Sequence, residues 1–193
     1  AGQNASSLVV FSLPTPAISL STNTATAQTQ GAAVTLDNML EIVDADSDNL
    51  LSAVVSVENG FISTDTLAVQ SITGITASYD SVSGILELSG TASLADYQTV
   101  LRTLTYQAGA DPSLNSGDYS TRAISLQVTD EDGNTSATVV INVTVEKSDV
   151  IPATLSFNSQ GGTAISNIET TAGASVTLPA APDYTGHSFT GWN

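Results

Sequence analysis

The sequence predicts an all-β protein: an antiparallel β-sandwich with one short helix, followed by a partial, small β module. Apolar and polar residues alternate over several short stretches, as in strands that bury one face. Thr, Val, Ser and Ile, which strands favour, are plentiful. Turn signals separate the stretches at short intervals, and many short strands joined by turns are typical of a sandwich.

The clearest alternation lies at residues 51–57, 124–128 and 137–145. In the first stretch the side chains expected to face the core are Leu51, Ala53, Val55 and Val57. Residues 75–79 and 85–88 are predicted to pair, because the segment between them has the composition of a hairpin turn.

Residues 94–104 depart from the strand pattern. Their apolar side chains recur every three or four residues, which predicts a helix: Leu94, Tyr97, Leu101 and Leu104. Ser93 is expected to cap this helix, and Asp96 lies in its first turn, where an acid is favourable. The helix is short, because the sequence then returns to strand.

Prolines mark the predicted boundaries. Residues 1–15 are interpreted as the end of a preceding segment with its linker, and the sandwich is predicted over 16–149. A second module is predicted over 150–193, because the composition changes after Pro152. A module of this size buries too little surface to form a core easily alone. The chain is therefore expected to be a piece of a longer protein.

The chain is strongly acidic, and this excludes several classes of partner. Nineteen acids stand against three bases, a net charge of −16. Nucleic acid is excluded because phosphate binding needs clustered Lys and Arg, and anionic lipid is disfavoured. No apolar run reaches the length of a membrane span, so no membrane insertion is expected. The charge favours cation binding, and the lack of cysteine excludes disulfides as a source of stability.

Two acidic turns that follow predicted strands are candidate cation sites. They read Asp44-Ala-Asp46-Ser-Asp48-Asn49 and Asp130-Glu131-Asp132-Gly133-Asn134. Calcium takes about six to eight oxygen ligands, which such turns offer. An EF-hand is excluded, because a loop starting at Asp44 has Asn49 where Gly is needed, and neither loop ends in the required Glu. Solvated turns without a metal stay open as the alternative.

The stretch 16–152 resembles the cadherin-like repeats of large bacterial surface adhesins. Three segments carry the resemblance: IVDADSDNLLSAVVSVENGF, ITASYDSVSGILELSGTASLADYQTVLRTLTY and ISLQVTDEDGNTSATVVINVTVEKSDVIP. The resemblance implies a cadherin/Ig-like sandwich, and it implies calcium at the N-terminal pole, shared with the preceding linker. The ligand positions of the family fall on Asp44, Asp46 and Asp130, with Asn49 and Asp132 as weaker candidates.

The two linkers depart from the family pattern. The exit linker of the family, Asn-Asp-x-x-Pro, reads here Ser-Asp-Val-Ile-Pro, so Asp149 is kept as a candidate ligand and the Asn is lost. The linker before the sandwich, Phe-Ser-Leu-Pro-Thr-Pro, contains no acid. The resemblance therefore implies an interdomain site that lacks part of its ligands.

The C-terminal segment resembles another repeat of bacterial surface proteins. The segment LSFNSQGGTAISNIETTAGASVTLPAAPDYTGHSFTGWN is similar to the Listeria–Bacteroides (InlB B-repeat-like) repeat. Its Asn-x-x-Gly-Gly, Leu-Pro-x-x-Pro and Gly-x-x-Phe-x-Gly-Trp motifs match. Such repeats are spacers and weak binding modules, and the resemblance implies that this module, about 153–193, is truncated.

Catalysis is not expected. The chain has a single histidine, His187, and no cysteine, so the usual general base and nucleophile are scarce. A glycosidase would need an aromatic cleft beside paired carboxylates, and aromatic residues make up only 5% of the chain.

These features predict a non-catalytic structural and adhesive repeat segment of a large bacterial protein. We expect it to be extracellular or on the cell surface, stiffened by calcium, with neighbouring repeats of the same polypeptide as partners. A cell-surface glycan or protein is a further candidate partner. The alternative is a carbohydrate- or protein-binding module, for example one that adds a strand at a sheet edge. An exposed aromatic platform would favour it, and Trp192 is the only sign of one in the sequence.

Overall fold

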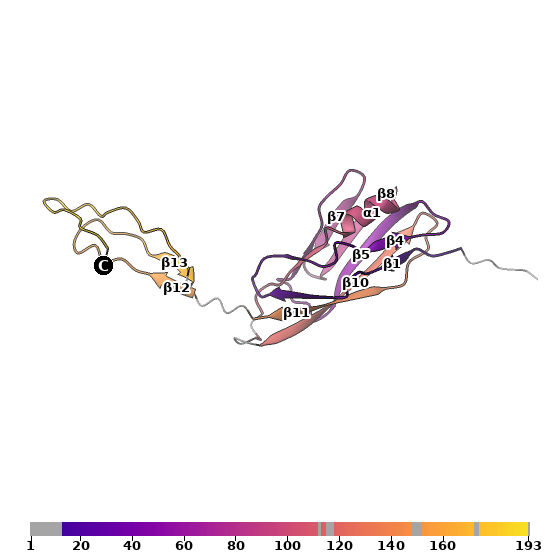
Figure 1. The fold of residues 1–193 in the computed structure, drawn as a ribbon, viewed down its shortest axis with the longest axis horizontal. Coiled ribbons are helices and arrows are strands. Elements are labelled where there is room, and N and C mark those ends of the chain that lie inside the picture. Colours follow the sequence, from indigo (N-terminus) through magenta and orange to yellow (C-terminus); the bar gives the residue numbers. More distant parts are fainter. Residues whose placement is uncertain (1–12, 112, 115–117, 148–151, 172–173, 193) are drawn as a thin grey trace, which may run out of the picture. The chain divides into compact units, whose positions relative to one another are not determined.

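The computed structural model describes residues 13–111, 113–114, 118–147, 152–171 and 174–192. The chain divides into two compact units, Ala1–Ser148 and Asp149–Asn193. The first is a β-sandwich with one helix, and the second is a small β unit (Figure 1). The predicted all-β fold class is therefore confirmed. None of the helical segments within these ranges has the length and apolarity that a membrane crossing requires.

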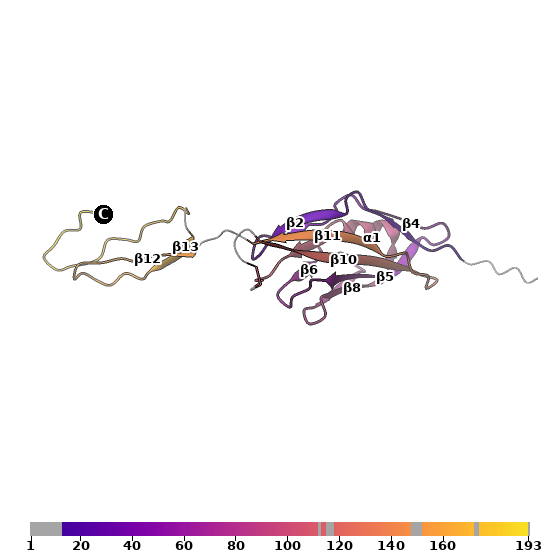
Figure 2. The same ribbon diagram turned by 90° about the horizontal axis from the view of Figure 1, so that it is seen from below.

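A six-stranded sheet forms the larger layer of the first unit. Its strand order is β2-β11-β10-β5-β8-β7, and β2 runs parallel to β11 while the other neighbours are antiparallel. Figure 2 shows β2 beside β11. The bounds are β2 Thr24–Gln28, β5 Asn49–Asn59, β7 Thr76–Asp80, β8 Ile85–Ser93, β10 Tyr119–Asp130 and β11 Val139–Glu146.

A three-stranded sheet, in the order β3-β9-β6, and a two-stranded pair, β1-β4, complete the sandwich. Their bounds are β1 Ala17–Ser19, β3 Val34–Thr35, β4 Glu41–Val43, β6 Thr66–Ala68 and β9 Thr105–Gln107. Both sheets contribute to one apolar core, because Val55 and Val143 of the large sheet and Leu67 and Tyr106 of the small sheet are all buried in the same cluster.

The alternating pattern is confirmed along most of β5 but fails at its start. Ala53, Val55 and Val57 are buried as predicted. Leu51, however, is 38% exposed, and its neighbour Leu50 is fully buried instead. The register of β5 against β8 shifts between Leu50 and Ser52, so an irregularity in the ladder reverses the phase of the side chains.

The predicted helix is confirmed as α1, Leu94–Leu101. The Oγ atom of Ser93 accepts a hydrogen bond of 3.1 Å from the backbone N–H of Asp96, which caps the first turn. Gln98 of the helix accepts a hydrogen bond from the N–H of Ile42, and the Nε of Arg102 donates to the carbonyl of Leu40. The helix therefore fixes the chain that leads into the first acidic turn.

The second unit is built on a short antiparallel pair, β12 (Pro152–Leu155) and β13 (Ile168–Thr171). None of its described side chains is fully buried. This low burial follows from the small size of the unit, because so few residues cannot remove much apolar surface from water.

Candidate functional site

The large sheet brings the two acidic turns to the same end of the first unit. The first turn ends at Asn49, the first residue of β5, and the second begins at Asp130, the last residue of β10. These strands pair antiparallel, with Asp130 opposite Leu50. Two contacts join the turns directly: the N–H of Glu131 donates to the carbonyl of Asn49 at 3.3 Å, and Asn49 Nδ2 donates to Glu131 Oε2 at 3.2 Å. We call this end, residues 44–49 and 130–134, the acidic pole.

Asp130 is the buried acidic residue of the acidic pole. Its Oδ1 accepts hydrogen bonds from the N–H groups of Asp132 and Asn134, at 3.0 and 2.8 Å, and its Oδ2 accepts one from Asn134 Nδ2 at 3.0 Å. Desolvation raises the pKa of Asp130, but these hydrogen bonds outweigh it and hold the pKa below its usual value. Asp130 is therefore an ionised side chain that fixes the shape of the second turn.

Asp44 carries a carboxylate oxygen that has no partner. Its Oδ1 accepts from the N–H of Ala45 at 2.6 Å, whereas its Oδ2 is buried and has no hydrogen bond among the described residues. The Oγ of the buried Ser47 is in the same situation. Buried oxygen atoms usually have a partner, and a water molecule or a cation is the kind of partner that these two atoms lack.

The raised pKa of Asp46 shows repulsion between carboxylates within the acidic pole. Its side chain is exposed, and partial desolvation together with the carboxyl of Asp44 raises its pKa. The charges of Asp132 and Asp130 raise the pKa of Asp46 further. The carboxylates of Asp44, Asp130 and Asp132 therefore lie close enough to Asp46 to disfavour its charge, and a bound cation would relieve this repulsion.

The predicted ligands thus differ in their placement. Asp44, Asp46, Asp130 and Asp132 are brought together, while Asn49 is turned toward Glu131 by its hydrogen bond. Asp149 lies outside the described residues. In the part of the chain that the structure describes, no three or more acidic or histidine side chains are already arranged around a point where a metal ion would fit. The oxygen-rich set fits calcium chemically, and a closed site would require the exposed side chains of Asp46 and Asp132 to turn inward.

Sequence reasoning missed a buried ionic cluster at the other end of β10. Arg122 donates from Nε to Asp65 Oδ2 at 2.7 Å and from its Nη2 to Asp111 Oδ2 at 3.3 Å. The hydroxyl of Tyr106 is buried with no hydrogen bond among the described residues, and desolvation and the nearby Asp65 raise its pKa. The signal was present, because Arg122 is in phase with the buried Ile124 and an inward arginine requires carboxylates.

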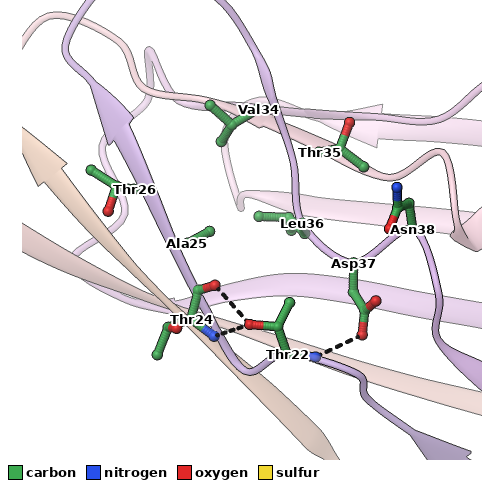
Figure 3. A pocket seen from close by; sticks show the side chains of 9 residues that line it. All are labelled: Thr22, Thr24, Ala25, Thr26, Val34, Thr35, Leu36, Asp37 and Asn38. Atoms are coloured by element: carbon green, nitrogen blue, oxygen red, sulfur yellow. Dashed lines mark hydrogen bonds between the residues drawn. The ribbon is translucent and has the colours of Figure 1, made fainter.

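A small cavity of about 340 Å³ lies beside the free edge of β2 (Figure 3). The Oγ1 of Thr22 donates to the carbonyl of Thr24 at 3.2 Å and accepts from the N–H of the same residue at 3.4 Å. The carboxylate of Asp37 accepts from the N–H groups of Thr22 and Met39 and from Ser21. Burial raises the pKa of Asp37, but these hydrogen bonds outweigh it and lower the pKa. The carboxylate of Asp37 therefore stabilises the local fold.

Comparisons with known proteins match both parts of the chain. Residues 154–193 match the model of the Listeria-Bacteroides repeat domain. Halomucin of Haloquadratum walsbyi is 31% identical over 134 residues, which are 62% of this chain and 2% of that protein. A protein of Evansella cellulosilytica whose name describes it as a membrane protein is 41% identical over 56 residues, 28% of this chain and 8% of that protein. The chain thus spans only a small part of these relatives.

Among solved structures, a chain of the Coh-OlpC-Doc435 cohesin–dockerin complex from Clostridium thermocellum is similar, with a TM-score of 0.44 and 11% identity. It covers 75% of this chain and 100% of its own length. The repeat match supports a non-catalytic module of a surface protein. The C-terminal resemblance is therefore confirmed: residues 154–193 are similar to the Listeria–Bacteroides repeat, while the cadherin-like resemblance of 16–152 stays a prediction.

Proposed function

We propose that the chain is a structural and adhesive segment of a long extracellular surface protein, in which calcium stiffens the acidic pole of the sandwich. The observation that carries this proposal is the buried, unpartnered Oδ2 of Asp44 beside three further carboxylates. A divalent cation would pair that oxygen and reduce the repulsion at once.

The ligands have different tasks in this proposal. Asp44 offers Oδ2 from the inner side of the first turn, and the exposed Asp46 and Asp132 close over the ion from the two turns. Asp130 keeps the second turn in shape through its hydrogen bonds to Asn134 and adds a fixed negative charge. Because the two turns are about 80 residues apart in the sequence, an ion between them would tie β5 to β10 at the pole.

Linkage gives the size of the effect. An ion that binds only the folded sandwich stabilises it by about 1.4 kcal/mol at ten times its Kd. Extracellular calcium sites have Kd values of roughly 0.1–1 mM, so about 10 mM calcium is sufficient for the test. A domain of this size gains a few degrees in Tm, on the order of 4 °C per kcal/mol.

Strand addition at β2, one form of the alternative binding function, is less favoured. The edge of β2 is partly closed, because the hydroxyl of Thr22 already engages both backbone groups of Thr24. Binding through this edge would require Thr22 to release them.

The test is thermal unfolding of the chain in EDTA and in calcium. We expect 10 mM CaCl₂ to raise the Tm of the sandwich by several degrees over EDTA. Because simple screening also stabilises an acidic chain, the control is MgCl₂ at the same concentration, which we expect to give a smaller shift. An identical Tm in EDTA and calcium, or equal shifts with both ions, would contradict the calcium site.

A further inference from the structure

Two adjoining cavities of about 540 Å³ each lie in the second unit. Both are lined by Asn158, Gln160 and Trp192, so the two cavities adjoin at these residues, and we call them together the trough. The first is completed mainly by Tyr184, His187 and Phe189, and the second by Leu155, Phe157 and Leu178. Each volume is within the range of small-molecule sites.

The rings of the trough are held by one another. The ring of Trp192 meets those of Phe157 and Phe189 edge-on, with centroids 5.0 Å apart in each pair. The rings of Tyr184 and His187 stack at 4.1 Å with an angle of 19° between their planes. The N–H of His187 donates to the carbonyl of Tyr184 at 2.9 Å, which closes the turn that carries the stacked pair.

A glycine brings the chain against this stack. Gly161 has a positive φ of 99°, and a Cβ there would lie 3.4 Å from the nearest ring atom of Tyr184. The Tyr184 ring is therefore supported by His187 on one side and by the loop around Gly161 on another. Such rings form a fixed platform rather than a set of freely rotating side chains.

The platform is accessible and has no acidic, lysine or arginine side chain in the lining that the structure describes. Tyr184 and Phe189 are 43% and 42% exposed, which leaves ring surface in contact with water. Among the described residues that line either cavity there is no Asp, Glu, Lys or Arg, although the chain has a net charge of −16. The polar groups of the lining are amides and hydroxyls instead, such as Asn158, Gln160 and Ser188. Such a lining favours an uncharged ligand that has both flat apolar faces and hydrogen-bonding edges.

We propose that the trough binds a neutral polysaccharide. A pyranose ring with equatorial hydroxyls has flat C–H faces that pack on Tyr184 and Trp192, and its hydroxyls can exchange hydrogen bonds with Asn158 and Gln160. Two adjoining cavities suit consecutive sugar residues of one glycan. This inference goes beyond the spacer role, and it is independent of calcium because the acidic pole lies in the other unit.

Trp192 is the single tryptophan of the chain, so a change in tryptophan fluorescence indicates binding in the trough. The full chain is titrated in EDTA with cellohexaose and, separately, with maltohexaose. We expect a saturable change in Trp192 emission with half-saturation below about 10 mM for at least one of the two hexasaccharides. The absence of a saturable change with both would overturn the proposal, and the use of EDTA separates that result from any failure of the calcium site.

Matched variants locate the binding. Tyr184→Ala and His187→Ala should each weaken the binding at least tenfold, whereas Tyr184→Phe should retain it. The control is Tyr119→Ala, which removes a tyrosine that is 70% exposed in the first unit and should leave the binding unchanged. Equal weakening by Tyr119→Ala would overturn the assignment. So would a dimer in sedimentation velocity that Tyr184→Ala abolishes, because the trough would then be occupied by a second copy of the chain.

Discussion

The Nε atom of Arg122 lies 2.7 Å from Oδ2 of Asp65, and both side chains are buried. The same carboxylate group accepts a hydrogen bond at Oδ1 from the N–H of Gly109, so the pair also fixes the loop after β9. A buried arginine between two aspartates bears on folding rather than on binding. If one of the three side chains is removed, the others are left as buried charges without a partner, which strongly destabilises the fold.

Replacing Arg122 should therefore strongly destabilise the first unit. Arg122→Met leaves the carboxylates of Asp65 and Asp111 buried without their cation, and we expect a loss of about 3–5 kcal/mol in the free energy of unfolding. Urea unfolding followed by far-UV circular dichroism measures it. The control is Arg102→Met, because Arg102 is only half-buried and should cost much less; equal costs would contradict the importance of the ionic cluster.

Asp44→Asn should have opposite effects in EDTA and in calcium. Without metal, the substitution removes one charge from a repelling group and should raise Tm by a few degrees. With 10 mM CaCl₂ it should abolish most of the calcium-dependent rise in Tm, because a neutral amide then replaces the carboxylate that would bind the ion. Glu87→Gln, which removes one exposed charge from β8, is the control and should change Tm little in either buffer. A lower Tm of Asp44→Asn in EDTA would argue against repulsion at the acidic pole.

The stability of the metal-free first unit should pass through a maximum as pH falls. Hydrogen bonds hold the pKa values of Asp37, Asp111 and Asp130 below their usual range, so their stabilising contribution is present at neutral pH. It is lost as pH falls below about 4, through the folded-state values. Asp46 acts in the opposite sense, because its raised pKa means that its charge costs stability at neutral pH and that protonation relieves this cost.

In EDTA we therefore expect Tm to rise slightly as pH falls from 7 toward the usual carboxyl range and to fall once pH is below about 4. Differential scanning calorimetry across this range measures the profile. Asp46→Asn should remove the rise and keep the fall, and a profile that is unchanged in this variant would contradict the role of Asp46.

Gly90 and Gly133 provide a matched pair of backbone tests. Both have positive φ, of 127° and 86°, but a Cβ at Gly90 would stand 2.1 Å from the carbonyl oxygen of Gly74, while Gly133 has open space. Gly133→Ala should cost only the strain of its backbone conformation, about 1 kcal/mol. Gly90→Ala should cost far more, because β8 and the segment before β7 must move apart. Similar unfolding free energies for the two variants would contradict the close approach.

The sequence predicted the sandwich because its strands obey a simple period. Ile124 and Val128 of β10 and Val143 of β11 are buried as the alternation requires. The phase error at Leu51 arises because a shift in the ladder depends on the pairing of β5 with its neighbours. Residue periodicity in one strand cannot reveal such a shift.

The candidate sites were predictable to different degrees. The acidic turns are visible as runs of Asp, but their meeting depends on the pairing of Asp130 with Leu50 and was expected only through the cadherin-like resemblance. The aromatic trough was predictable only through Trp192. Phe157 and Tyr184 come from distant, aperiodic segments and meet near it through loop geometry rather than through a strand or helix pattern.

The parallel pairing of β2 with β11 has a mechanical consequence. These strands are the first and the last of the six-stranded sheet in chain order, and five residue pairs hold them together, from Thr24 with Asn142 to Gln28 with Glu146. A pull on the chain from both ends would draw them in opposite directions along their length. The hydrogen bonds between them would then be loaded together, in shear, rather than opened one after another, so this geometry favours resistance to tension.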